Sequence, residues 1–316
     1  MPYIDIFNGD ADGIFALHQL RLNNPQKSRL VTGVKRDTLL LQQALSASNS
    51  VITVLDISSH ANREPLLQLL NQGNTIHYFD HHFAGEIVDS PLFHSHIDTS
   101  PGVCTSILVD RYLVGKYRLW AVAAAFGDNL HASAFQLAES LKLEAQQAEK
   151  LRELGELINY NAYGETLDDL HISPESLFQA IHSFTEPFEF IQSSGELKQL
   201  REGFRSDMRK AQEKKALRQS SAGRIFQFPN APWSRRVSGV FSNQLARESP
   251  ELAHALLVER RDGTFLVNVR APITRPYGAD KLCLKFSGGG RVAAAGINKL
   301  AQEDVDRFFS AFEKQF

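Results

Sequence analysis

Acidic and histidine side chains follow three of the four β-strands that we expect in the first 80 residues. The candidates are Asp10 and Asp12 after residues 3–7, Asp56 after residues 51–55, and Asp80, His81 and His82 after residues 75–79. Ligands of parallel α/β sheets bind at the carboxyl ends of the strands, so these groups are expected to converge. Asp128 is a further candidate, because it lies just after the longest apolar stretch, residues 119–126.

A cluster of carboxylates of this kind favours a cation site. Gathered carboxylates repel one another and raise their own pKa values, and divalent cations remove this cost. Carboxylate oxygens with one imidazole suit Mn²⁺ or Mg²⁺ better than Zn²⁺, which favours nitrogen and sulfur ligands. Two such ions about 4 Å apart can activate water and clamp a phosphoryl group for in-line displacement. A site of this kind is therefore compatible with the hydrolysis of a phosphate ester.

Each part of this pattern also has a purely structural interpretation. An isolated aspartate after a strand, such as Asp56, often caps a helix. Residues 10–13 are compatible with a turn or with half of a calcium loop, although the other EF-hand ligands are missing. His81 and His82 alone are typical of an ordinary loop. The combination of all these residues is much harder to produce by chance than any one of them.

Short β-branched runs alternate with amphipathic stretches in the first part of the chain. The expected strands are residues 3–7, 29–34, 51–55 and 75–79, and the expected helices are residues 14–22, 38–45 and 62–70. Such alternation predicts βαβ units, and therefore an α/β fold with a parallel sheet and right-handed crossovers. Residues 104–182 are mostly helical in pattern, which adds a helical extension to this sheet.

The C-terminal part has a different pattern. Residues 196–218 carry eight basic and four acidic residues beside one apolar stripe, which predicts an amphipathic connector helix. Strand-like stretches follow at residues 224–228, 236–240, 254–259 and 264–269, and helical ones at residues 242–247, 279–286 and 302–316. We therefore predict a catalytic domain over residues 1–195, a connector helix and linker over residues 196–223, and a smaller α+β domain over residues 224–316.

Composition and charge exclude several classes of protein. The 316 residues are 43% apolar and 22% charged, which is typical of a soluble globular protein and not of a disordered one. The 34 basic and 36 acidic residues provide no general field for a long nucleic acid. No apolar stretch approaches the roughly 20 residues of a membrane helix, and no signal peptide is visible. We therefore expect a cytoplasmic protein without a membrane partner.

Five motifs resemble those of the DHH/DHHA1 phosphoesterase family, in family order and over almost the whole chain. They are residues 8–13 (Asn-Gly-Asp-Ala-Asp-Gly), 54–56 (Val-Leu-Asp), 80–82 (Asp-His-His), 127–129 (Gly-Asp-Asn) and the glycine-rich stretch 286–296. The first four resemble the motifs of the family's catalytic domain, and the last resembles its C-terminal substrate motif. The chain is most similar to the small oligoribonuclease (nanoRNase) members.

The resemblance implies a hydrolase with two Mn²⁺ ions, or with Mg²⁺ in their place. The metal ligands that it implies are Asp10, Asp12, Asp56, His81 and Asp128. Among them, Asp56 would bridge the two ions. Asp80 would orient His81, and His82 would contact the scissile phosphate or assist the leaving oxygen.

The resemblance also implies a substrate site in the C-terminal part. Gly288, Gly289 and Gly290 would let backbone N–H groups approach an anionic substrate, and Arg270 and Arg291 would bind it as well. Two departures from the family pattern change the expectation. Ile6 or Asn8 stands where many members have a leading histidine ligand, so one ion is expected to bind more weakly or to complete its shell with water. Arg291 replaces a histidine, which keeps phosphate recognition but shifts base or sugar preference.

The resemblance narrows the expected substrate to very short linear oligonucleotides. The most specific form of this prediction is a linear dinucleotide such as pGpG. The products would be 5′-mononucleotides. The chain has no room for the additional single-strand-binding domain that a processive DNA exonuclease needs. Two alternatives remain open: a phosphatase or pyrophosphatase acting on nucleoside bisphosphates or pyrophosphate, and a catalytically weak nucleotide-binding regulator. Base preference, maximum substrate length, the physiological metal and homodimer formation are also left open.

Overall fold

A computed structural model describes all residues from Met1 to Phe316. The chain divides into two compact units, Met1–Glu202 and Gly203–Phe316. The division falls within one long helix, α9 (Gly195–Gln212). No helix has both the length and the apolar character that crossing a membrane requires.

The first unit is built on a five-stranded sheet in which every neighbouring pair is parallel. The strands are β1 (Tyr3–Phe7), β2 (Ser28–Thr32), β3 (Val51–Leu55), β4 (Thr75–Asp80) and β5 (Phe93–Ile97), in the order β2-β1-β3-β4-β5. The predicted parallel α/β sheet is therefore confirmed. Strand β5 was not expected, because its sequence Phe-His-Ser-His-Ile lacks the aliphatic run that marks the four buried strands.

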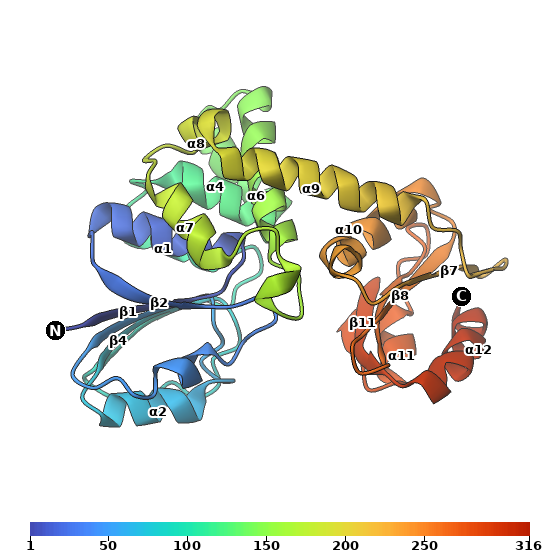
Figure 1. The fold of residues 1–316 in the computed structure, drawn as a ribbon, viewed down its shortest axis with the longest axis horizontal. Helices are drawn as coiled ribbons and strands as arrows, with labels where there is room; N and C mark the ends of the chain where they lie inside the picture. Colours follow the sequence, from blue (N-terminus) through green and yellow to red (C-terminus); the bar gives the residue numbers. More distant parts are fainter. The chain divides into compact units, whose positions relative to one another are not determined.

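Helices cover both faces of this sheet, as Figure 1 shows for α1 on one side and α2 on the other. The α-helices of the unit before α9 are α1 (Ala11–Asn23), α2 (Arg63–Asn71), α3 (Thr105–Tyr112), α4 (Arg118–Gly127), α5 (His131–Ser140), α6 (Ala145–Asn161), α7 (Pro174–His182) and α8 (Pro187–Ser193). The expected helix over residues 38–45 is a 3₁₀ helix, η1 (Leu40–Ala44), and a second 3₁₀ turn, η2, spans Leu167–Asp169. The expected helical extension after the sheet is present.

Strand alternation assigns each side chain of β1 to one of the two faces. Ile4 and Ile6 pack in the apolar core with Leu66 and Leu69 of α2. Asp5 points to the other face, where it is fully buried and forms a bidentate ion pair with Arg21 of α1. The Asp5–Arg21 pair also forms hydrogen bonds with side chains of the two neighbouring strands. Ser28 Oγ of β2 donates to Asp5 at 2.6 Å, and Arg21 donates to Thr53 Oγ1 of β3 at 2.9 Å.

The second unit contains a six-stranded mixed sheet in the order β10-β11-β9-β8-β7-β6. Its strands are β6 (Arg218–Gln219), β7 (Gly223–Phe228), β8 (Ala253–Glu259), β9 (Phe265–Arg270), β10 (Gly289–Arg291) and β11 (Ala294–Leu300). The helices are α10 (Pro232–Glu248), α11 (Ala279–Leu284) and α12 (Val305–Gln315), and the 3₁₀ turn η3 spans Gln302–Asp304. Figure 1 shows α10 on one face of the sheet and α11 on the other. The expected smaller α+β part is confirmed.

One prediction for the second unit is wrong. Residues 236–240 are not a strand but the middle of α10, where Val237 lies on a buried helical stripe with Phe241 and Leu245 that packs on the sheet. The expected connector helix is present as α9 but ends at Gln212, before its expected end at residue 218, and the expected linker at residues 220–223 is the turn between β6 and β7 together with Gly223, the first residue of β7. Gly223 adopts φ 156°, and a Cβ there would lie 2.0 Å from the carbonyl oxygen of Ala253. The predicted domain boundaries at residues 195 and 224 stay predictions.

Candidate metal centre

The aspartates and His81 converge at the carboxyl edge of the parallel sheet. His81 Nε2 lies 3.3 Å from Asp56 Oδ1, 3.9 Å from Asp12 Oδ2 and 4.0 Å from Asp128 Oδ2. Potential ligand atoms gather in two groups, Asp12-His81-Asp128 and Asp56-His81-His82, and within each group they lie within 4.8 Å of one another. His81 belongs to both groups, so the imidazole expected to be a ligand occupies the centre of the cluster.

Asp12 is fixed by the N-terminus of a helix that is remote in sequence. Its two carboxylate oxygens accept hydrogen bonds from the backbone N–H groups of Thr105 and Ser106, each at 2.7 Å. These residues begin α3, whose own N-cap residue, Cys104, provides no side-chain hydrogen bond to cap the helix. A carboxylate is stabilised at a helix N-terminus by the unpaired N–H groups and the helix dipole. Asp12 is therefore held in one orientation.

The conformation of the chain around Asp56 and Asp128 directs both side chains to the cluster. Asp56 follows β3 with φ 59°, a left-handed conformation that aspartate and asparagine tolerate better than most residues. Asp128 ends α4, which packs closely against α6. A Cβ on Gly155 of α6 would lie 1.9 Å from the carbonyl oxygen of Ala123, and one on Gly127 would lie 2.8 Å from the carbonyl oxygen of Gly155. Glycine at these positions lets the two helices approach each other.

Sequence reasoning missed a lysine that belongs to the same cluster. Lys35 Nζ lies 2.5 Å from Asp10 Oδ2 and 3.6 Å from Asp128 Oδ1, and it donates to Asn159 Oδ1 at 2.9 Å. Lys35 follows β2 closely, just as the aspartates follow β1, β3 and β4. Its position after a strand could therefore have indicated it. A lysine is not a metal ligand, however, so a search for metal ligands does not include it.

The role predicted for Asp80 needs a correction. Asp80 Oδ1 lies 2.8 Å from Nδ1 of His82, whereas the sequence predicted that this carboxylate would orient His81. Both residues come from the end of β4, where Asp80 points inward and is fully buried, and the side chain of His82 is 46% exposed. Asp80 therefore fixes the ring orientation of His82. The remaining nitrogen of that ring, Nε2, is left for another partner.

Burial and mutual repulsion change the protonation of the cluster. Burial, together with the charges of Asp10 and Asp12, raises the pKa of Asp56 well above its ordinary value. Burial and the charge of Asp12 raise the pKa of Asp128 to about 6. Burial alone would lower the pKa of His81, but the surrounding carboxylates, Asp56 foremost, raise it to about 10. The raised pKa values of Asp56 and Asp128 show that the negative charge of the cluster is not fully compensated. A bound cation would provide the missing positive charge.

The donor set fits a divalent cation of the Mn²⁺ or Mg²⁺ class. It consists of carboxylate oxygens and imidazole nitrogen, with no thiolate in either group of ligand atoms. The two residues at the departure from the family pattern differ. Ile6 has no ligand atom and is fully buried in the sheet. The side-chain nitrogen of Asn8 donates to the carbonyl oxygen of Lys35 at 3.3 Å, and its Oδ1 is buried without a hydrogen-bond partner.

We expect the metal-free protein to lose stability as the pH rises from 6.5, the ordinary pKa of histidine, towards 10. Over this range folded His81 keeps a proton that the unfolded chain has released, so protons favour the folded state. Mn²⁺ needs the neutral ring and competes with that proton. The rise in Tm on adding Mn²⁺ should therefore be larger at about pH 9 than at about pH 6.5. A rise that is independent of pH, or smaller at the higher pH, would contradict this assignment.

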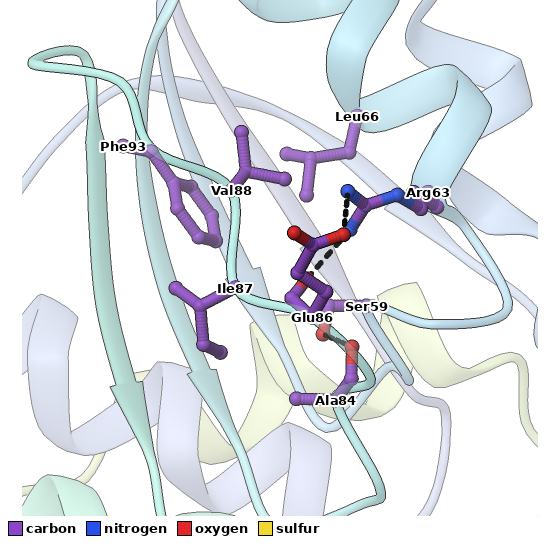
Figure 2. A pocket seen from close by; sticks show the side chains of 8 residues that line it. All are labelled: Ser59, Arg63, Leu66, Ala84, Glu86, Ile87, Val88 and Phe93. Carbon is purple, nitrogen blue, oxygen red and sulfur yellow. Dashed lines mark hydrogen bonds and ion pairs between the residues drawn. The ribbon is translucent and has the colours of Figure 1, made fainter.

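A pocket beside the Asp-His-His segment is structural. Figure 2 shows its lining residues, which are Ser59, Arg63, Leu66, Ala84, Glu86, Ile87, Val88 and Phe93. Arg63 donates to the backbone oxygen of Glu86 at 2.5 Å and pairs with its carboxylate at 3.2 Å, and Ser59 Oγ donates to the carbonyl oxygen of Ala84 at 3.4 Å. None of the predicted ligands or substrate-binding residues lines this pocket. Its contacts anchor the loop after His82 to α2.

In the second unit, the sheet register brings the two predicted arginines onto one row. Ala294 of β11 pairs with Arg291 of β10 on one side and with Arg270 of β9 on the other, and residues paired in this way share a face. Arg270 Nε donates to Asn243 Oδ1 at 2.8 Å, and Arg291 is exposed.

The glycine run beside these arginines has little space for side chains. A Cβ on Gly288 would lie 2.4 Å from the carbonyl oxygen of Gly296, and one on Gly290, at φ 142°, would lie 2.6 Å from Ala295 Cα. Gly289 faces open space, with no atom within 4 Å of a Cβ at that position. A ligand can therefore approach the backbone at this point.

Comparison with known proteins identifies the fold. No model of a known family matches the sequence, and no curated protein matches it significantly. The manganese-bound exonuclease RecJ superimposes with a TM-score of 0.62 at 15% identity, over 99% of this chain and 89% of that one. The pGpG-specific phosphodiesterase PggH from Vibrio cholerae gives 0.56 at 15% identity, over 100% of this chain and 98% of that one.

A third structure is larger than this chain. RecJ from Thermus thermophilus, in complex with Mn²⁺, gives a TM-score of 0.56 at 15% identity, over 99% of this chain but only 51% of that one. This chain thus spans about half of that RecJ. The chain has the fold of RecJ and of PggH, which is the fold that its motif resemblance to the DHH/DHHA1 family predicts.

Proposed function

We propose that this protein is a metal-dependent phosphodiesterase that hydrolyses very short linear oligonucleotides, dinucleotides such as pGpG included, to 5′-mononucleotides. The observation that carries the proposal is the convergence of Asp12, Asp56, His81 and Asp128 at the strand ends of a parallel sheet. The fold of RecJ and PggH supports it, since one of these proteins is an exonuclease and the other a pGpG-specific phosphodiesterase.

The residues that would hold two Mn²⁺ or Mg²⁺ ions are those implied by the family motifs: Asp10, Asp12, Asp56, His81 and Asp128. When bound, such ions neutralise charge on the phosphoryl group and lower the pKa of the attacking water. The chain itself keeps the ligands in place, through the α3 N-terminus on Asp12 and the strand-end geometry at Asp56. A preset arrangement reduces the reorganisation needed in the reaction.

His82 and Asp80 would act on the substrate side of the cluster. Asp80 holds Nδ1 of His82, so that the partly exposed ring presents Nε2 to a phosphoryl or leaving oxygen. In the second unit, Arg270, Arg291 and the open backbone at Gly289 would bind one end of the nucleotide chain. A guanidinium fork suits phosphate oxygens, and exposed backbone N–H groups suit the same anion.

The test is a turnover panel with Mn²⁺: 5′-phosphorylated di- to pentanucleotides of each base, a nucleoside bisphosphate and pyrophosphate. We expect mononucleotide products, the highest kcat/KM for the shortest chains and loss of activity after metal removal with EDTA. Turnover of pyrophosphate alone, or of the bisphosphate alone, would establish the phosphatase alternative. Tight dinucleotide binding with no turnover at any metal concentration would establish the regulator alternative.

Arg291→Ala should raise KM for dinucleotides with little change in kcat, by about tenfold for a lost charge-assisted contact. The exposed Arg291 would contribute ground-state and transition-state binding equally, because it lies on the substrate-binding sheet and not among the metal ligands. Arg247→Ala, an exposed arginine of the same unit, is the matched control. A loss confined to kcat would place Arg291 in transition-state stabilisation instead.

A further inference from the structure

We propose that the Lys35 ammonium is a tethered cation that competes with one divalent ion for Asp10, so that the centre binds one Mn²⁺ tightly and a second more weakly. The proposal rests on the proposed function in one respect, namely that the aspartate cluster binds divalent ions. What it adds is that the two ions bind with different affinities. The list of metal ligands alone does not predict that difference.

Both oxygens of Asp10 are engaged. Oδ1 accepts hydrogen bonds from the backbone N–H groups of Asp12 and Gly13, at 3.0 Å and 3.1 Å, and so caps α1. Oδ2 lies 2.5 Å from Lys35 Nζ. Consistent with this, neither group of converging ligand atoms includes Asp10. An ion that uses Asp10 must share its carboxylate with a full positive charge that is already in contact.

Lys35 is built into this position and does not merely reach it from the surface. Its backbone N–H donates to the carbonyl oxygen of Ala162 at 2.9 Å, and its carbonyl oxygen accepts from the side chain of Asn8 at 3.3 Å. At the other end, Nζ donates to Asn159 Oδ1 and lies 5.6 Å from the ring centre of Tyr163. The side chain is 22% exposed. Contacts at both ends therefore keep the ammonium beside Asp10.

The ammonium also affects the second carboxylate on this side of the cluster. Asp128 Oδ1 lies 3.6 Å from Nζ, while its Oδ2 faces His81 at 4.0 Å. Lys35 thus compensates the charges of Asp10 and Asp128, whereas Asp56 has no ammonium beside it and faces only the imidazoles of His81 at 3.3 Å and His82 at 3.8 Å, which carry no charge when they bind a metal ion. One ion is attracted to the uncompensated side. A second ion on the side of Asp10 meets a like charge close by, which weakens its binding.

The experiment measures Mn²⁺ binding and not turnover. The full-length protein, freed of metal with EDTA and dialysed, is titrated with Mn²⁺ while the free ion is followed by its EPR signal. We expect wild type to bind one equivalent tightly and a second at least about tenfold more weakly. In Lys35→Met the dissociation constant of the second ion should fall by about tenfold or more, the size of effect that neighbours of metal ligands have.

Two further variants separate charge from packing. Lys35→Arg keeps the positive charge and should retain the weak second site. Lys150→Met removes an exposed lysine of α6 and should bind as wild type does. Circular dichroism checks that each variant is folded, and Lys35→Gln replaces Lys35→Met if the latter does not fold.

Several results would overturn the proposal. Wild type that binds two ions with equal affinity would do so, and so would a Lys35→Met variant whose second ion binds as in wild type or is lost. Unchanged Mn²⁺ binding with a raised KM for dinucleotides would place Lys35 on the substrate phosphate instead. Wild type that binds no Mn²⁺ at all would contradict the proposed function as well, whereas two equal sites would leave that function intact.

Discussion

Asp56→Asn lowers kcat/KM for dinucleotide hydrolysis by about 10³-fold or more, which corresponds to roughly 4 kcal/mol of transition-state stabilisation. Asp56 is buried directly after β3, its Oδ1 lies 3.3 Å from His81 Nε2, and in the proposed function it would be a ligand of the metal ions. An amide oxygen there is a much weaker ligand than a carboxylate for a hard cation. Steady-state kinetics with Mn²⁺ on a 5′-phosphorylated dinucleotide measure the loss.

The effect of the same substitution on the stability of the metal-free protein should become more favourable from pH 7 to about pH 9, because the proton that Asp56 favours on His81 costs more free energy as the pH rises. Burial and the charges of Asp10 and Asp12 raise the pKa of Asp56, and a neutral amide does not carry the cost of that buried charge. Asparagine also tolerates the left-handed backbone at φ 59° better than alanine does. Urea unfolding in EDTA at both pH values measures this change, and Asp168→Asn, at an exposed position of the same unit, is the control for both effects. Wild-type rates in Asp56→Asn would remove this residue from the metal centre.

Arg21→Met lowers the free energy of unfolding by about 3–5 kcal/mol, because it leaves a buried carboxylate without its cation. Asp5 is fully buried and accepts from Arg21 and from Ser28, so its charge has no access to water once the guanidinium is removed. The pair joins β1 to α1, and the turn between these two elements contains Asp10. Urea unfolding followed by circular dichroism measures the loss.

The double variant Asp5→Leu/Arg21→Met should recover most of that stability, since replacing both members of a buried ion pair by apolar groups is often neutral. Arg152→Met is the matched control. Arg152 pairs with Glu149 and Glu156 on the surface of α6, and such exposed pairs contribute about 1 kcal/mol or less. A loss in Arg21→Met no larger than in this control would mean that the network contributes little.

Local sequence patterns determined much of the fold and the identity of the metal-ligand candidates. Buried strands with an aspartate after them predicted both the parallel sheet and the edge where Asp56 and His81 meet, because strand ends converge whatever the intervening sequence. The same kind of pattern failed at residues 236–240. There Val237 and Val240 are β-branched, which favours a strand, but they lie three residues apart, which puts them on one face of a helix and on opposite faces of a strand.

The parts that escaped prediction depend on contacts between distant segments. The α3 N-terminus holds Asp12 across more than 90 residues, and Asn159 of α6 holds Lys35 across more than 120. The partner of Asp80 was also ambiguous, because two histidines, His81 and His82, follow it in the sequence. The structure shows that Asp80 forms its hydrogen bond with His82. The sequence can therefore predict which charged residues come together. It cannot predict which of them form hydrogen bonds or ion pairs with one another, because the spacing along the chain does not determine this.

The most direct test of the account is a product analysis in ¹⁸O-labelled water. The protein is incubated with Mn²⁺ and the linear dinucleotide pApG, and the masses of the products are determined by mass spectrometry. The account predicts two 5′-mononucleotides, with one ¹⁸O atom in the phosphate of the guanosine nucleotide, because water attacks the bridging phosphorus and the adenosine 3′ oxygen leaves. An intact dinucleotide, or release of inorganic phosphate without cleavage of the bridge, would contradict it.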